Sequence, residues 1–156
     1  MTPTVPVLVA DSLNVPGLVR VSSHHGPRET MGRVVANVTA RGMVVFARLD
    51  HGAGALAAGL ELRPTELLLF GNARGGTPLM QSRQSIGIDL PLKILVWQDE
   101  SGVTWVGYND PDWVARRHGL APDRAGAVNA MHKALAEIAG EAAGQSSDTM
   151  EGRQDG

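Results

Sequence analysis

His51 is the residue whose type and position favour chemistry most strongly, because it directly follows Asp50 and precedes a small, alanine-rich segment with several glycines. A neighbouring carboxylate can hold one tautomer of an imidazole and leave the other ring nitrogen for proton transfer or ligand binding. The alternative is that Asp50 caps a helix and His51 merely occupies its first turn. Both interpretations stay open, although strand ends and loops are where functional sites are usually built.

A second candidate is the glycine-rich segment from Gly71 to Thr77, whose sequence is GNARGGT. Its backbone N–H groups, a following helix N-terminus and the charge of Arg74 would suit a phosphate or a carboxylate. The segment lacks both the Gly-Lys-Ser/Thr ending of a P-loop and the GxGxxG spacing of dinucleotide-binding folds. In the alternative, the glycines relax a turn and Thr77 caps a helix with Pro78 in its first position, which leaves only Asn72 unexplained.

Other residues that carry chemistry show no functional spacing. No two histidines have the i, i+4 spacing of a helical metal site, so no metal is expected. His118 follows two arginines at the predicted end of a helix, which favours a structural role for this cation-rich segment. Asp89 and Asp99 give no sign of sharing a cleft, and no GxSxG motif is present. The serines lie in segments typical of caps, turns or strand ends, namely Ser22, Ser23, Ser82, Ser85 and Ser101.

The composition limits the classes of protein to consider. A chain of 156 residues with 43% hydrophobic residues suits one globular domain. The absence of cysteine excludes disulfides, thiolate nucleophiles and iron–sulfur clusters on cysteine ligands. The net charge is −2 and the basic residues are scattered, so we expect no nucleic-acid partner. The apolar run from Val5 to Ala10 is too short for a signal peptide or a membrane span, so a cytoplasmic protein without membrane contact or cofactor is expected.

Apolar periodicity predicts the elements that must position the candidates. Met31, Val34, Val35 and Val38 recur at helical spacing and form one apolar face. Pro27 and Gly42 flank them and suit the first turn and the left-handed end of a helix. The predicted strands are 18–22, 43–49, 66–71, 93–99 and 103–108. The predicted helices are 28–41, 51–59, 77–83 and 109–119. A last helix is expected to be capped by Asp123 and to carry an apolar stripe of Val128, Met131, Leu135 and Ile138.

This order, β-α-β-(α)-β-α-β-β-α-α, predicts an α+β domain of about five strands rather than a doubly wound fold. The run from Leu67 to Phe70 is apolar at four successive positions, so we expect both faces of that strand to be covered. The folded unit is expected over residues 16–143, with a flexible segment over 1–15 and a disordered tail over 144–156.

Several motifs between Val44 and Leu120 resemble those of the bacterial and archaeal family called domain of unknown function 302. They are VFARLDH, GLELRPTELLLFGN, GTPLMQ, IDLPLKILVW and YNDPDWVARRHGL, and they follow one another in the family's order. The resemblance implies a curved antiparallel sheet with helices on one side, related to one half of the TATA-box-binding protein, and a dimer. It implies no particular activity and no DNA binding, since function lies in sites and the basic patch is missing.

The resemblance also marks candidate positions. This chain has Ala73 where the family commonly has proline, which implies a less rigid loop. The motif positions carried over are His51, Gly71, Asn72, Gly76, Thr77, Met80, Asp89, Pro91 and Tyr108.

Three functional hypotheses follow. The first is a binding module with one pocket near His51 and the Gly71 to Thr77 loop, for a small anionic or carbonyl-bearing ligand. The second is an enzyme in which His51 is the general acid or base and Asp50 orients it. The third is a homodimerisation module without a ligand. The ligand-binding residues of the first hypothesis are His51, Asn72, Gly76, Thr77, Met80 and Tyr108.

Overall fold

The structure is a computed structural model that describes residues 14–145. Most of the expected flexible segment and tail, 1–15 and 144–156, lies outside the described residues. The elements are β1 (Leu18–Ser23), α2 (Pro27–Ala40), β2 (Val44–Asp50), α3 (His51–Ala57), β3 (Thr65–Gly71), α4 (Ala73–Ser82), the 3₁₀ helix η1 (Gln84–Asp89), β4 (Leu92–Gln98), β5 (Thr104–Asn109), α5 (Pro111–His118), the 3₁₀ helix η2 (Pro122–Arg124) and α6 (Ala125–Ala142).

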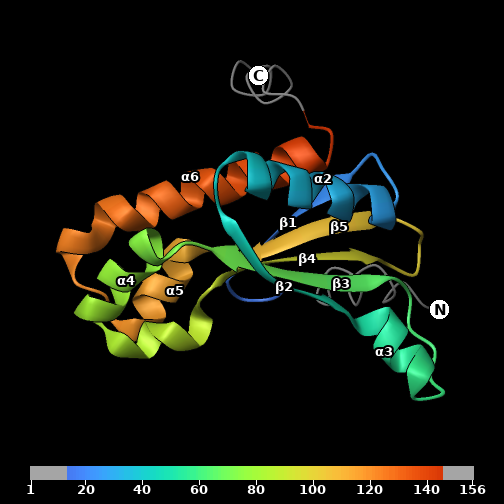
Figure 1. Ribbon diagram of the computed structural model, residues 1–156, viewed down its shortest axis with the longest axis horizontal. Coiled ribbons are helices and arrows are strands. Elements are labelled where there is room, and N and C mark those ends of the chain that lie inside the picture. The colour runs from blue at the N-terminus through green and yellow to red at the C-terminus, as the bar shows by residue number, and fades with distance from the viewer. Residues whose placement is uncertain (1–13, 146–156) are drawn as a thin grey trace, which may run out of the picture.

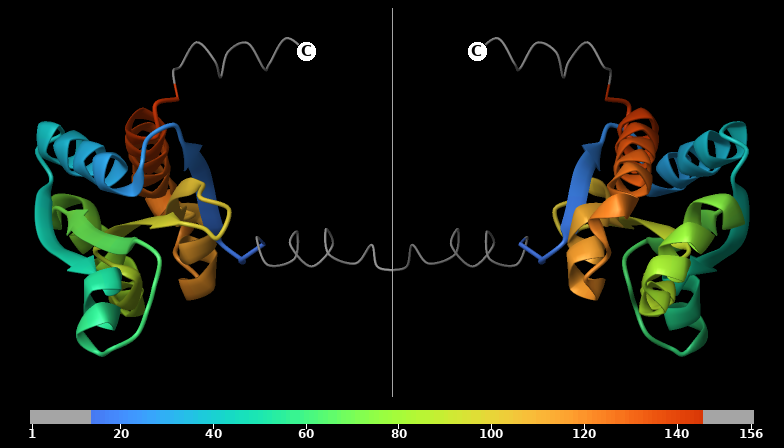
Figure 2. Two further views of the ribbon diagram at one scale, coloured as in Figure 1. Left: turned by 90° about the vertical axis from the view of Figure 1, so that its right-hand side faces the viewer. Right: turned by 90° about the vertical axis from the view of Figure 1, so that its left-hand side faces the viewer.

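The strands form one antiparallel sheet of five strands in the order β1-β5-β4-β3-β2, which confirms the predicted α+β fold. The long helices α2 and α6 lie over one face of the sheet (Figure 1). The short helices α4 and α5 gather at one end of the sheet, and α3 lies at the other end (Figure 1). Figure 2 shows the same layering from the two ends of the molecule.

The core lies between the sheet and the two long helices. Of the predicted stripe of α2, Met31, Val34 and Val38 are completely buried and Val35 is half-buried. The stripe packs in one cluster with sheet residues such as Phe70 and Ile94. The predicted helix end is also confirmed, since Gly42 adopts a φ of 76°, which an L side chain rarely tolerates.

The opposite face of the sheet is only half buried. Leu67 lies opposite Leu95, and Trp97 lies opposite Trp105, so these side chains share one face. Each of them is half-buried, whereas Leu68 on the helix-covered face is fully buried. The prediction that both faces of β3 are covered is therefore wrong for the single chain.

Two details of the connections matter for the helices and the hairpin. Asp123 lies in η2 and does not cap α6, whose N-cap is Arg124 without a side-chain hydrogen bond, so that prediction is wrong. In the β4–β5 turn, the carboxylate of Asp99 accepts hydrogen bonds from the Trp105 indole and from the backbone N–H groups of Ser101 and Val103. These bonds hold the pKa of Asp99 below its ordinary value.

Candidate functional site

The glycine-rich segment forms the start of α4 rather than a loop. Asn72 is the N-cap, and its Oδ1 accepts a hydrogen bond from the Gly75 N–H at 2.7 Å. The predicted start at Thr77 and Pro78 is wrong, because Asn72 is an equally favoured cap and the helix runs through Pro78. The N–H of Gly76 also bonds back to Asn72 O. These N–H groups are therefore occupied within the chain, and the predicted anion cradle is not free.

A groove of about 880 Å³ lies along α4. Its walls come from α4, from α6, from the chain between η1 and β4, and from the adjoining ends of β2 and β3. Most of the surface is apolar, and it includes Met43, Phe46, Leu69, Met80, Leu92 and Met131.

Two arginines line the same groove. Arg41 already pairs with Glu137 at 2.9 Å and with Glu141 at 3.8 Å. Arg74 is exposed, and no hydrogen bond or ion pair of its side chain is found within residues 14–145. The guanidinium of Arg74 can therefore meet a ligand without breaking an internal pair.

Four of the six predicted ligand-binding residues lie together at this groove, namely Asn72, Gly76, Thr77 and Met80. His51 does not. In the β2–β3 pair, Val44 lies opposite Gly71 and Asp50 lies opposite Glu66. The length of β2 therefore separates His51 from the Gly71 to Thr77 segment by about 20 Å at the usual rise of a strand, and the single pocket expected from the sequence is two separate regions.

Tyr108 also lies outside the groove. Its side chain belongs to the core and is 5% exposed. Burial raises the pKa of its hydroxyl, and the nearby charge of Asp110 adds to that rise. Tyr108 therefore has a packing role in the structure and does not line the proposed ligand site.

Asp50 and His51 adopt the capping arrangement. Asp50 is the N-cap of α3, and its Oδ1 accepts a hydrogen bond from Ala53 N at 2.8 Å. His51 is the exposed first residue of that helix, and no hydrogen bond or ion pair of its side chain is found in the described part of the chain. No second polar group therefore positions His51 for acid–base catalysis.

A polar cluster at the junction of η1 and α5 escaped the sequence reasoning. Asp89 Oδ2 pairs with His118 Nε2, and Arg117 Nη1 donates to both oxygens of Asp89 at 2.9 Å. The other ring nitrogen of His118, Nδ1, lies 2.9 Å from Ser85 Oγ. The available signal was that Asp89 and His118 both lie in motifs of the resembled family, but 29 residues separate them.

Lys93 borders this cluster from β4. Its burial lowers the pKa of its ammonium group, and the charge of Asp89 partly opposes that effect. Lys93 and Asp89 both line a small cavity of about 30 Å³ beneath α5 and α6.

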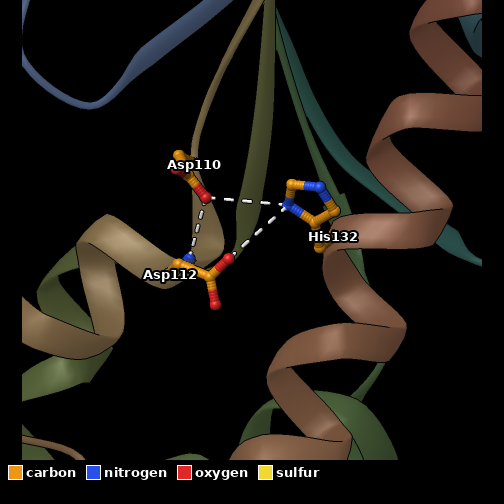
Figure 3. A group of neighbouring side chains, drawn as sticks. All are labelled: Asp110, Asp112 and His132. Carbon is orange, nitrogen blue, oxygen red and sulfur yellow. Dashed lines mark hydrogen bonds and ion pairs between the residues drawn. The ribbon is translucent and has the colours of Figure 1, made fainter. Parts of the chain in front are cut away.

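A third polar group joins the start of α5 to α6. Figure 3 shows Asp110 and Asp112 directed toward His132. His132 Nδ1 lies 3.6 Å from Asp110 Oδ1 and 4.0 Å from Asp112 Oδ2. Carboxylate and imidazole side chains are common metal ligands. However, Asp110 Oδ1 already accepts a hydrogen bond from Asp112 N as the N-cap of α5. The positive end of the helix dipole at this position also disfavours a bound cation. We therefore interpret the group as an electrostatic contact between helices.

Comparisons with known proteins agree with this fold. The family model described as "Domain of unknown function DUF302" matches residues 19–138. The crystal structure of an uncharacterized conserved DUF302 protein from Bacillus stearothermophilus matches 83% of this chain and 99% of that chain, with a TM-score of 0.72 and 20% identity. This likeness supports the fold alone.

Curated relatives are much closer in sequence. The chain is 49% identical over 128 residues to "Fluoride-specific ion channel FluC 1" of Brucella suis biovar 1 (strain 1330), covering 82% of this chain and 50% of that protein. It is also 49% identical to the protein of that name from Brucella abortus biovar 1 (strain 9-941), covering 47% of it. The chain thus spans about half the length of these relatives.

A search of the described helices finds none that is long and apolar enough to cross a membrane. The family model covers most of the chain. It includes most of α6 and all five strands, apart from the first residue of β1. The chain therefore belongs to the family described as domain of unknown function DUF302.

Proposed function

We propose that this chain is a binding module whose groove holds a small molecule with an apolar body and an anionic or carbonyl-bearing end. The observation that carries the proposal is the groove itself. Its volume of about 880 Å³ lies in the range typical of small-molecule sites, and it combines an apolar lining with a few polar groups.

The groove combines an apolar wall with polar groups that can bind the charged or carbonyl end of a ligand. Met43, Met80 and Met131 give the apolar wall flexible thioether side chains that adapt to ligands of different shape. Arg74 supplies a guanidinium that can bind a carboxylate in bidentate fashion. Asn72 uses Oδ1 for its helix cap, so its side-chain NH₂ remains able to donate to a carbonyl.

Arg74→Ala tests the anionic end of the ligand. We expect decanoate and decanol both to displace the fluorescent probe anilinonaphthalene sulfonate from the wild-type groove. The apparent affinity of the variant for decanoate should fall by up to about fivefold, because an exposed ion pair contributes about 0.2–1 kcal/mol. Its affinity for decanol should not change. Arg28→Ala removes an exposed arginine of α2 that does not line the groove, and it should bind both compounds like wild type.

Equal losses for the alcohol and the acid would contradict the role given to Arg74. Fluoride belongs in the same assay, because the curated relatives are named for it. Displacement by fluoride that disappears in Arg74→Ala would assign the ion to the groove.

Self-association is a second candidate function, and the half-buried face of the sheet favours it. That face carries Leu67, Leu95, Trp97 and Trp105, and it continues to the edge strand β2, where Leu49 is 44% exposed. Apolar surface of this kind is removed from water when two copies pack face to face.

Leu95→Arg tests this candidate. A charge at the centre of the face should shift the protein from dimer to monomer at micromolar concentration, as measured by light scattering, because the arginine would be buried without a partner. Leu56→Arg is the matched control, since Leu56 is a 75% exposed residue of α3. A wild-type protein that is monomeric throughout the micromolar range would count against self-association.

A further inference from the structure

The cluster at the junction of η1 and α5 contains the parts of an activated serine. Ser85 Oγ lies 2.9 Å from His118 Nδ1, and the opposite ring nitrogen pairs with Asp89. The side chains of His118 and Asp89 are only 8% and 13% exposed, while Ser85 is exposed to solvent. A reachable hydroxyl is thus backed by a shielded imidazole and a shielded carboxylate.

The hydrogen-bond directions follow from the groups themselves. An ionised carboxylate can only accept, so the neutral imidazole of His118 must carry its proton on Nε2 and donate it to Asp89. His118 Nδ1 is then unprotonated and accepts the proton of the Ser85 hydroxyl. Arg117 Nη1 donates to both carboxylate oxygens of Asp89, which orients that carboxylate.

We propose that Ser85 is a nucleophile toward small carboxylic esters, with His118 as its general base and Asp89 and Arg117 as positioning residues. This site is separate from the groove, because none of Ser85, His118 and Asp89 lines it, and Asp89 lines the small cavity beneath α5 and α6. A hydroxyl, an imidazole and a carboxylate in this sequence activate serine in several unrelated folds. There the hydroxyl bonds to Nε2 and the carboxylate to Nδ1, whereas His118 uses Nδ1 for Ser85 and Nε2 for Asp89.

The hydrolysis needs no reactant other than the ester and water. Ser85 Oγ forms a bond to the acyl carbon while its proton passes to His118 Nδ1. The bond from that carbon to the alcohol oxygen breaks, and the proton leaves with the alcohol. Water then attacks the acyl-serine with the same base, releasing the carboxylic acid and restoring the hydroxyl of Ser85.

A fluorophosphonate probe tests the proposal directly, because it forms a phosphonyl–serine bond with loss of fluoride only at an activated hydroxyl. We expect mass spectrometry of peptides from the full chain to locate the adduct on Ser85. The labelling rate should fall at least about a hundredfold in His118→Gln, since a general base contributes about 10²–10⁴-fold. Ser85→Ala, at an exposed position, should fold normally and lose the adduct.

Two controls separate this site from other effects. Ser101→Ala changes an exposed serine of the β4–β5 turn and should label like wild type. Arg28→Ala, at an exposed position of α2, should also label normally. The adduct forms on Ser85, which does not line the groove, so a failure of the groove proposal leaves this one standing. Absence of an adduct on Ser85, or equal labelling of wild type and His118→Gln, would overturn the proposal.

Discussion

Replacing Asp89 with alanine is expected to lower the free energy of unfolding by about 3 kcal/mol, which is the low end of the loss for a broken buried ion pair. The carboxylate is 13% exposed and bonds to His118 and Arg117, so its removal leaves a shielded imidazole and a guanidinium without their acceptor. The low end applies because Arg117 is 50% exposed and water can replace part of the lost interaction. Urea unfolding measures the change.

Two further variants sharpen this prediction. Asp89→Asn keeps an amide oxygen that still accepts from one partner, and it should lose less stability than Asp89→Ala. Asp123→Ala removes an exposed carboxylate of η2 and should remain within about 0.5 kcal/mol of wild type. If Asp89→Ala also stays within that range, the cluster does not hold η1 against α5.

Ala130→Trp is expected to weaken decanol and decanoate binding at least tenfold, because the indole would fill the groove that the apolar chain occupies. Tenfold corresponds to about 1.4 kcal/mol, less than the gain from burying one apolar side chain of ordinary size. Ala130 is an exposed residue of α6 that lines the groove, so the larger side chain needs no change in the core. Displacement of anilinonaphthalene sulfonate measures the affinity.

Asn129→Trp is the matched control for this prediction. Asn129 is the exposed neighbour of Ala130 on the same helix and is not among the groove residues. Its replacement adds the same indole and should leave both affinities unchanged. Equal losses in the two variants would mean that the indole acts through the helix and not through the groove.

Much of the fold was predictable because its signals are local and repeated. Met31, Val34 and Val38 mark one face of α2 by spacing alone, and all three are fully buried. The predicted end of a helix at Gly119 is confirmed, since Gly119 caps α5 in the left-handed conformation with a φ of 62°. Apolar periodicity and glycine positions are local signals, so they can be recognised without knowledge of the tertiary structure.

The start of α4 shows where local rules stop. Asn72 and Thr77 are both favoured N-caps, and Pro78 after Thr77 strengthens the wrong choice. The contacts that α4 makes with η2 and α6 lie far along the chain, and no local pattern records them. A preference among caps of similar strength is therefore decided by packing.

The candidate site was partly predictable for a similar reason. Asn72, Thr77 and Met80 are close in sequence and lie together at the groove. The family motifs also include His51, but the antiparallel register of β2 and β3 places His51 at the opposite end of β2 from Gly71. Such separations depend on the pairing and register of two strands, which the pattern of one segment does not reveal.

Nuclear magnetic resonance of protein labelled with ¹³C in the methionine methyl groups tests the groove most directly. On addition of decanoate, the account predicts that the methyl signals of Met43, Met80 and Met131, which line the groove, shift in a saturable manner. The signal of Met31, which is completely buried in the core beneath α2, should stay in place. Unchanged signals of all three groove residues, or a shift of Met31 equal to theirs, would contradict the proposed binding site.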